Sequence, residues 1–118
     1  MNAVAHIAGY LSNKMGVTFA TGESFDTNDG VSHPRNSQYP MIVLKGVSAD
    51  MSAFAEAVRA SDLPHLGFIR EMIETTDDAE IVAMLAKKSE SDIEYLGIGV
   101  FGPHDTVKAL TKQFSLWK

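Results

Sequence analysis

The stretch that decides the fold is residues 95–103, Tyr-Leu-Gly-Ile-Gly-Val-Phe-Gly-Pro. Its apolar run predicts a buried strand, and Gly97 and Gly99 inside it indicate that a neighbouring segment packs closely on that strand. Gly102-Pro103 then turns the chain into an amphipathic helix expected over residues 103–114. In α/β proteins, the point where a strand passes into a helix often lies beside a ligand. The stretch therefore predicts an architecture and the place of a site, but not a reaction.

Apolar spacing on either side of this stretch predicts the other elements. Helices are expected over residues 2–15, 48–58 and 77–88, and strands over residues 41–44 and 64–69. The run Met41-Ile42-Val43-Leu44 is continuously apolar, which is typical of a strand buried on both faces. Residues 17–40 read as a long loop with turn chemistry at 26–30. The alternation predicts one α/β domain over residues 1–118, with a mostly parallel sheet covered by helices on both faces.

Composition limits the class of protein and its partners. The 118 residues are 45% hydrophobic and 21% charged, as in an ordinary globular domain. Neither a membrane-spanning run nor a signal peptide is visible, and the absence of cysteine removes disulfides and thiol chemistry. A cytoplasmic location is therefore expected. The formal net charge of −5 disfavours contact with phosphate backbones, so nucleic acid is not an expected partner.

The start of the chain is unusual for this architecture, because a helix is expected from residue 2 with no strand before it. Two explanations stay open. A preceding strand is missing from this chain, or residues 17–20 supply the extra strand.

Three blocks carry a resemblance to a known family. They are Asn-Ala-Val-Ala-His at residues 2–6, Tyr-Pro-Met-Ile-Val-Leu-Lys at 39–45, and residues 95–103 followed by Val107, Leu110-Thr111 and Leu116. The chain resembles the bacterial domain of unknown function 2000 family, which is in turn similar to the type 2 peptidyl-tRNA hydrolases. That resemblance implies a three-layer α/β/α sandwich with a small mixed sheet, whose first strand precedes the first helix, and often a homodimer. This chain lacks that strand.

The residues of the hydrolases carry over only in part. Their strand-end aspartate aligns with Glu71 and their threonine with Glu94, while their helix glutamine and histidine align with Asn2 and His6. Their lysine falls before the first residue of this chain. The resemblance therefore supports the fold more strongly than the activity.

The expected site follows from these positions. Glu71, Glu94 and His6 are the candidate catalytic residues, because two nearby carboxylates can divide acid and base roles and a histidine can assist them near neutral pH. The alternative is that both carboxylates are solvated at strand ends, that Arg70 or Arg59 pairs with one of them, and that His6 only lies at the edge of the core or on the helix surface. Asn2, Gly97, Gly99 and His104 are the candidate ligand-binding residues.

No cofactor and no metal site are expected. The four histidines are dispersed, and the acidic turn at residues 26–30 has its glycine one position too early for a calcium loop. The expected function is binding of a small molecule or nucleotide-type ligand. Two alternatives stay open: a hydrolase with altered active-site residues, and a dimeric interaction domain without catalysis.

Overall fold

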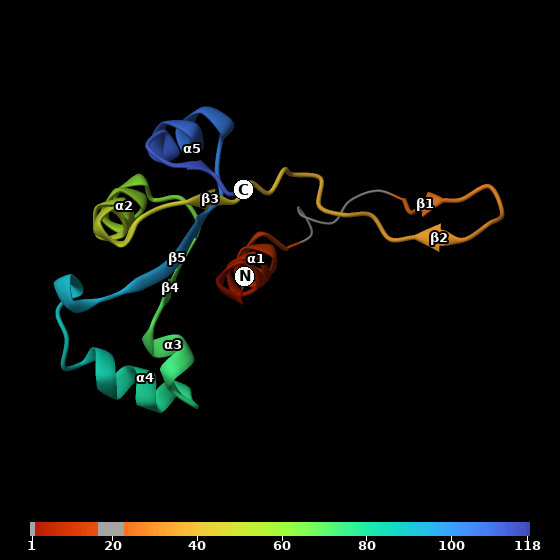
Figure 1. The fold of residues 1–118 in the computed structure, drawn as a ribbon. Helices are drawn as coiled ribbons and strands as arrows, with labels where there is room; N and C mark the ends of the chain where they lie inside the picture. The colour runs from red at the N-terminus through yellow and green to blue at the C-terminus, as the bar shows by residue number, and fades with distance from the viewer. Residues whose placement is uncertain (1, 17–22) are drawn as a thin grey trace.

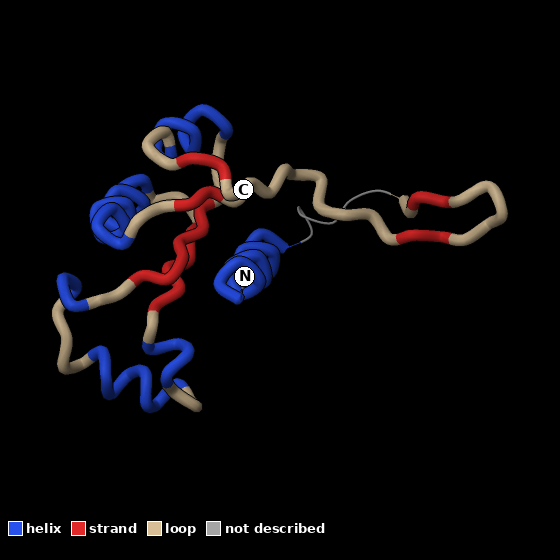
Figure 2. Tube along the Cα trace, viewed as in Figure 1, coloured by secondary structure: helices blue, strands red, loops and turns tan. Residues whose placement is uncertain are grey.

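The structure is a computed structural model that describes residues 2–16 and 23–118. Figures 1 and 2 show helices gathered around a short pair of strands, with a hairpin extending away from them. The helices are α1 (Asn2–Met15), α2 (Ser48–Ser61), α3 (Glu71–Glu74), α4 (Asp78–Leu85), the 3₁₀ helix η2 (Glu90–Asp92) and α5 (His104–Thr111). The strands are β1 (Phe25–Asp26), β2 (Ser32–His33), β3 (Leu44–Lys45), β4 (His65–Ile69), β5 (Tyr95–Val100) and β6 (Ser115–Leu116).

The centre of the fold is the pair β4–β5, which is antiparallel with His65 opposite Val100 and a register shift at Phe68/Ile69. The other two described pairs, β1–β2 and β3–β6, are antiparallel as well. The expectation of a mostly parallel sheet is therefore wrong for the described strands. A parallel pair needs a connection that crosses a face of the sheet. Here α3, α4 and η2 lie beyond one end of β4, and the chain re-enters at the end it left (Figure 1).

Helices α1 and α2 both pack against β4–β5 (Figure 1), and the mixed α/β class expected from the sequence is confirmed. On one face, α1 lies so close that a Cβ added to Gly99 would be 1.9 Å from Ile7 Cγ2, and one added to Gly97 would be 3.1 Å from Ala3 Cβ. The close approach predicted from the two glycines is thus confirmed. On the other face, α2 buries Phe54, Ala55 and Val58.

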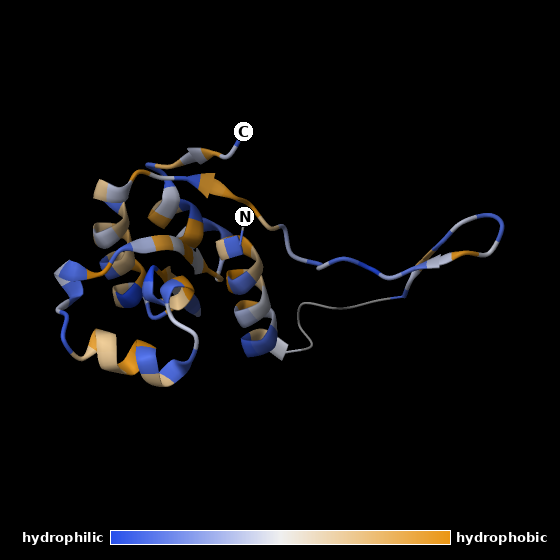
Figure 3. Ribbon diagram, turned by 60° about the horizontal axis from the view of Figure 1, so that its bottom comes forward, coloured by the Kyte–Doolittle hydropathy of each residue, from blue (hydrophilic) through white to orange (hydrophobic). Residues whose placement is uncertain are grey.

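The segment at residues 41–44 differs from its prediction. Only Leu44 enters a strand, and β3 pairs on one side with β6 alone. Met41 and Ile42 are 60% and 65% exposed. The expectation of a strand buried on both faces is wrong, because within the described ranges no second strand pairs with the other edge of β3. Figure 3 shows this apolar segment at the surface of the molecule.

The loop at residues 23–40 forms a hairpin that projects from the body (Figure 1). The predicted turn is confirmed: Gly30 N donates to Thr27 O at 3.1 Å, and Gly30 has φ of +89°, which a residue without a Cβ adopts readily. Residues 17–20, the alternative source of an extra strand, lie outside the described residues.

The helix expected to start at Asp77 is confirmed as α4. The Asp77 side chain caps this helix by accepting a hydrogen bond from Glu80 N at 2.9 Å. However, α4 buries no residue, and Val82 is 67% exposed. This helix lies below the strands and does not cover their face (Figure 1). Among the described residues, no helix has the length and apolarity needed to cross a membrane.

Candidate functional site

The predicted carboxylates lie at neighbouring strand ends. Arg70 and Glu71 follow β4, Glu94 precedes β5, and Arg70 N donates to Glu94 O at 3.1 Å. The Arg70 guanidinium also makes two side-chain hydrogen bonds to Glu94, of 2.6 and 2.7 Å. These bonds lower the pKa of the Glu94 carboxyl. Glu94 is therefore the carboxylate that pairs with Arg70, as the alternative prediction has it.

Glu71 is the one buried charged residue of the described chain, with 2% of its surface exposed. Lys88 Nζ donates to its Oε1 at 2.5 Å, whereas Oε2 is buried without a hydrogen-bond partner in the described structure. The hydrogen bond from Lys88 lowers the pKa of Glu71 most, while burial and the charge of Glu94 oppose it. Glu71 is therefore held as an anion by one lysine.

Three other predicted residues, His6, Asn2 and His104, make no hydrogen bond to Glu71 or Glu94 among the described contacts. His6 is exposed on α1, and its ring stacks on Phe68 with centroids 5.0 Å apart and an interplanar angle of 16°. Asn2 is exposed in the first turn of the same helix. His104 lies in the first turn of α5, with Nδ1 3.1 Å from Asp105 Oδ1, and both side chains are exposed. His104 thus belongs to a different end of the fold.

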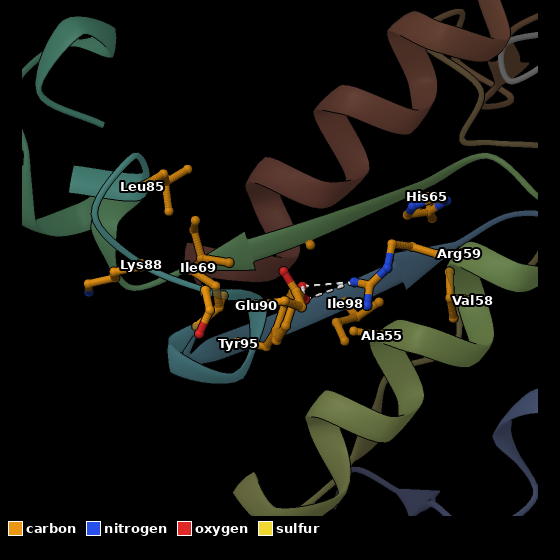
Figure 4. A pocket seen from close by; sticks show the side chains of 13 residues that line it. Ala55, Val58, Arg59, His65, Ile69, Leu85, Lys88, Glu90, Tyr95 and Ile98 are labelled. Atoms are coloured by element: carbon orange, nitrogen blue, oxygen red, sulfur yellow. Dashed lines mark hydrogen bonds and ion pairs between the residues drawn. The ribbon is translucent and has the colours of Figure 1, made fainter. Parts of the chain in front are cut away.

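A cavity of about 390 Å³ lies on the α2 face of the strand pair, between α2, β4, β5 and the segment that ends in η2 (Figure 4). Its lining residues are Ala55, Val58, Arg59, His65, Gly67, Ile69, Leu85, Lys88, Ser89, Glu90, Ile93, Tyr95 and Ile98. Its volume falls in the range of small-molecule sites, which combine apolar walls with a few polar groups.

Three polar side chains meet in this cavity (Figure 4). Arg59 Nη1 donates to Glu90 Oε1 at 2.9 Å and to the Tyr95 hydroxyl at 3.0 Å, and that hydroxyl donates to Glu90. The bond to Tyr95 raises the pKa of Arg59. Burial raises the pKa of the Tyr95 hydroxyl, and Glu90 acts in the same direction. The three groups therefore form a fixed network with a charged arginine.

Sequence reasoning did not find this network, and Arg59 does not pair with Glu71 or Glu94. Arg59, Glu90 and Tyr95 lie on three separate elements, and no motif spacing connects them. The only sequence signal is Tyr95, a phenol at the start of an otherwise apolar strand, which needs a polar partner when it is covered.

A second cavity of about 540 Å³ lies between α1, β5 and residues 39–46. Glu94, Gly97 and Gly99 line it, so three of the seven predicted site residues border this space, and none of the seven borders the smaller cavity. Ala3, Ile7 and Leu11 of α1 form one of its walls. In residues 2–16 and 23–118, no group of three or more His, Asp or Glu side chains is placed to hold a metal ion.

These features define a small α/β domain in which α1 and α2 pack against an antiparallel strand pair, with one cavity on the α2 face and a second between α1, β5 and residues 39–46. The chain belongs to the family described as protein of unknown function (DUF2000), which matches residues 1–118, and this confirms the family predicted from the three blocks. No curated protein matches the chain.

One solved structure shares the fold, a protein of unknown function, Atu0240, from Agrobacterium tumefaciens strain C58. It is similar with a TM-score of 0.81 and 19% identity, over 99% of this chain and 85% of that chain. At this identity the likeness concerns the fold alone. Neither comparison shows the resemblance to peptidyl-tRNA hydrolases.

Proposed function

We propose that this domain binds a small organic molecule with an apolar body and an acidic group, in the cavity beside Arg59. The observation that carries the proposal is the Arg59–Glu90–Tyr95 network on the wall of a 390 Å³ cavity with an apolar floor. Val58 and Ala55 of that floor are buried, while Arg59 next to them retains 43% side-chain exposure. A ligand can therefore reach the guanidinium and apolar surface together.

The hydrogen bonds of Arg59 indicate the chemistry of the ligand. A guanidinium carries five N–H donors in a planar fork. In the described structure its hydrogen bonds to Glu90 and Tyr95 both start from Nη1. Nε and Nη2 remain as a pair of donors, the arrangement that a carboxylate or phosphate accepts in two parallel hydrogen bonds. This favours a carboxylate or a mononucleotide as the ligand.

Thermal melting with a panel of small aromatic carboxylates, aliphatic carboxylates and mononucleotides tests the proposal. A ligand at about ten times its Kd stabilises the folded state by about 1.4 kcal/mol, which for a domain of this size raises Tm by about 5 °C. We expect Arg59→Gln to abolish the shift. Arg35→Gln is the matched control, because it removes the same charge from the projecting hairpin, where the Arg35 guanidinium lies over the Phe25 ring. A panel without any shift, or an equal shift in Arg59→Gln, contradicts the proposal.

The hydrolase alternative gains no specific support from this geometry. A general base works best with a pKa near the operating pH, and the pKa of Glu71 is lowered by Lys88. His6 stacks on Phe68 and has no hydrogen bond to either carboxylate among the described contacts. The roles of Glu71, Glu94 and His6 in catalysis stay predictions, as do the homodimer and the cytoplasmic location. The helices on both faces of β4–β5 support the inference of a three-layer sandwich.

A further inference from the structure

The cavity beside Arg59 holds an available acceptor as well as the available donors of the guanidinium. The hydrogen bonds that the Glu90 side chain accepts, from Arg59 and from the Tyr95 hydroxyl, both end on Oε1 in the described structure. The other carboxylate oxygen, Oε2, can therefore accept from a ligand, and the Glu90 side chain is 57% exposed. Arg59 Nη1 lies 2.9 Å from Glu90 Oε1, so the donors and the acceptor belong to one small polar patch (Figure 4).

The charges around this cavity are balanced before a ligand arrives. Arg59, Lys88 and Glu90 are the charged side chains among its lining residues. Lys88 is paired with Glu71, and Arg59 is paired with Glu90. A ligand that carried only an anion to Arg59 would place it beside the Glu90 carboxylate, where like charges repel. A ligand that also carried a cation could place that cation on Glu90 Oε2 and keep the balance.

The backbone that carries Glu90 is held in place by its neighbours. Glu90 is the first residue of η2, and Ser89 before it donates from N and from Oγ to Asp92 Oδ2, at 3.0 and 2.9 Å. These two hydrogen bonds close the short helix on itself and lower the pKa of the Asp92 carboxyl. A site whose groups are fixed before binding loses less conformational entropy when the ligand arrives, so this arrangement favours affinity.

The space next to the polar patch has an aromatic wall. The Tyr95 ring lies against Gly67, since a Cβ added to Gly67 would be 2.7 Å from Tyr95 Cε1 and 3.1 Å from Cδ1. Ile69 and Ile98 line the same cavity, whose volume of about 390 Å³ is ample for one aromatic side chain. Aromatic rings pack well against one another in offset or edge-to-face arrangements. The wall therefore favours a ligand with an aromatic ring close to its charged groups.

We propose that the ligand of this cavity is a free α-amino acid with an aromatic side chain. Its carboxylate accepts two hydrogen bonds from Arg59 Nε and Nη2, its ammonium group donates to Glu90 Oε2, and its ring packs against Tyr95. The carboxylate and the ammonium group share one carbon, which suits a guanidinium and a carboxylate that are in contact with each other. This proposal rests on the function proposed above and narrows its ligand from acids in general to zwitterions.

The first test compares matched ligands on the wild-type protein by isothermal titration calorimetry. The probes are the two enantiomers of phenylalanine, 3-phenylpropanoate, which lacks the ammonium group, and phenethylamine, which lacks the carboxylate. We expect one enantiomer of phenylalanine to bind at least about tenfold more tightly than either truncated probe. It should also bind more tightly than the other enantiomer, because three contacts at one carbon distinguish the two hands. Equal binding of phenylalanine and 3-phenylpropanoate overturns the proposal but leaves an acid site beside Arg59 in place.

The second test assigns the ammonium contact to Glu90. Glu90→Gln keeps an oxygen acceptor for Arg59 and Tyr95 and removes the charge. We expect phenylalanine to bind at least about tenfold more weakly to this variant and 3-phenylpropanoate to bind more tightly, because the repulsion is relieved. Glu56→Gln is the matched control, since Glu56 is exposed on α2 and does not line the cavity. A loss of equal size for both ligands overturns the proposal, and if the variant fails to fold the wild-type comparison still decides. Binding that is unchanged in Arg59→Gln contradicts the proposed function itself.

Discussion

Replacing Lys88 with methionine should destabilise the protein strongly at neutral pH. Glu71 is 2% exposed, and Lys88 is the donor to its Oε1, while Oε2 has no partner in the described structure. Removing one member of a buried pair costs about 3–5 kcal/mol, because the other charge stays buried and uncompensated. The Lys88 side chain is 35% exposed, so water screens the pair and the expected loss falls to about 2–3 kcal/mol. This corresponds to a fall in Tm of about 10 °C.

The pH dependence distinguishes the lost ion pair from lost packing. In the wild-type protein Lys88 lowers the pKa of Glu71, so this contribution to stability is present above the unfolded-state pKa of about 4.3 and is lost as the pH falls through the lower folded-state value. In Lys88→Met the hydrogen bond and the charge of Lys88 are gone, so the pKa of Glu71 rises, because burial and the charge of Glu94 are then opposed only by the backbone hydrogen bond. The variant then regains stability relative to the wild type as Glu71 is protonated. We expect the difference in unfolding free energy to be largest at pH 7, to shrink as the pH falls toward about 4.3, and to approach zero only below the lowered pKa of Glu71 in the folded wild-type protein.

Urea unfolding of the two proteins across this pH range measures the difference. Lys87→Met is the control, since Lys87 is exposed and next to Lys88 in sequence. The double variant Lys88→Met with Glu71→Gln should recover much of the loss at pH 7, because the buried charge is then gone. A difference that is equal at both ends of the pH range would falsify the reasoning, since it would place the effect in packing.

Three further outcomes are expected. Gly99→Ala should lower the free energy of unfolding in urea by about 1–3 kcal/mol, because the added Cβ would lie 1.9 Å from Ile7 Cγ2. Gly9→Ala is the control: its Cβ meets nothing within 4 Å, and it should stabilise α1 by about 0.5–1 kcal/mol. Equal effects of the two substitutions would contradict the close packing of α1 on β5. Asp77→Ala should cost about 0.5–2 kcal/mol, seen as a lower Tm, because the cap on Glu80 N is lost, and an unchanged Tm would count against the cap. Glu94→Gln should lower the free energy of unfolding only slightly, and less in high salt, because its pair with Arg70 is exposed. A large or salt-independent loss in urea unfolding would show that the pair is not solvated.

The sequence predicts well those helices and strands whose packing face can be read from the spacing of their own apolar residues and glycines. The spacing of apolar residues places α1 and α2, and Gly97 and Gly99 predict the close approach of α1 to β5. The direction of the strands is not a local property. The alternation of helices and strands predicts parallel pairing only when the intervening helices cross the sheet, and α4 does not.

The candidate site shows the same limit. The adjacency of Arg70, Glu71 and Glu94 follows from strand ends and could be predicted. The pairing of Glu71 with Lys88, seventeen residues later, depends on where α4 ends and the chain turns back. The contact between Arg59 of α2 and Tyr95 of β5 joins residues thirty-six positions apart, and only the assembled fold brings these side chains together.

The projecting hairpin changes how large this protein looks in solution. The radius of gyration is 16.9 Å, against about 13.5 Å for a compact chain of this length. The longest dimension is 58 Å and the shortest 27 Å. A single copy will therefore diffuse and elute as a heavier compact particle does, and a gel-filtration volume alone can be mistaken for that of a dimer. Light scattering or sedimentation equilibrium, which measure mass without reference to shape, is the correct way to count the subunits.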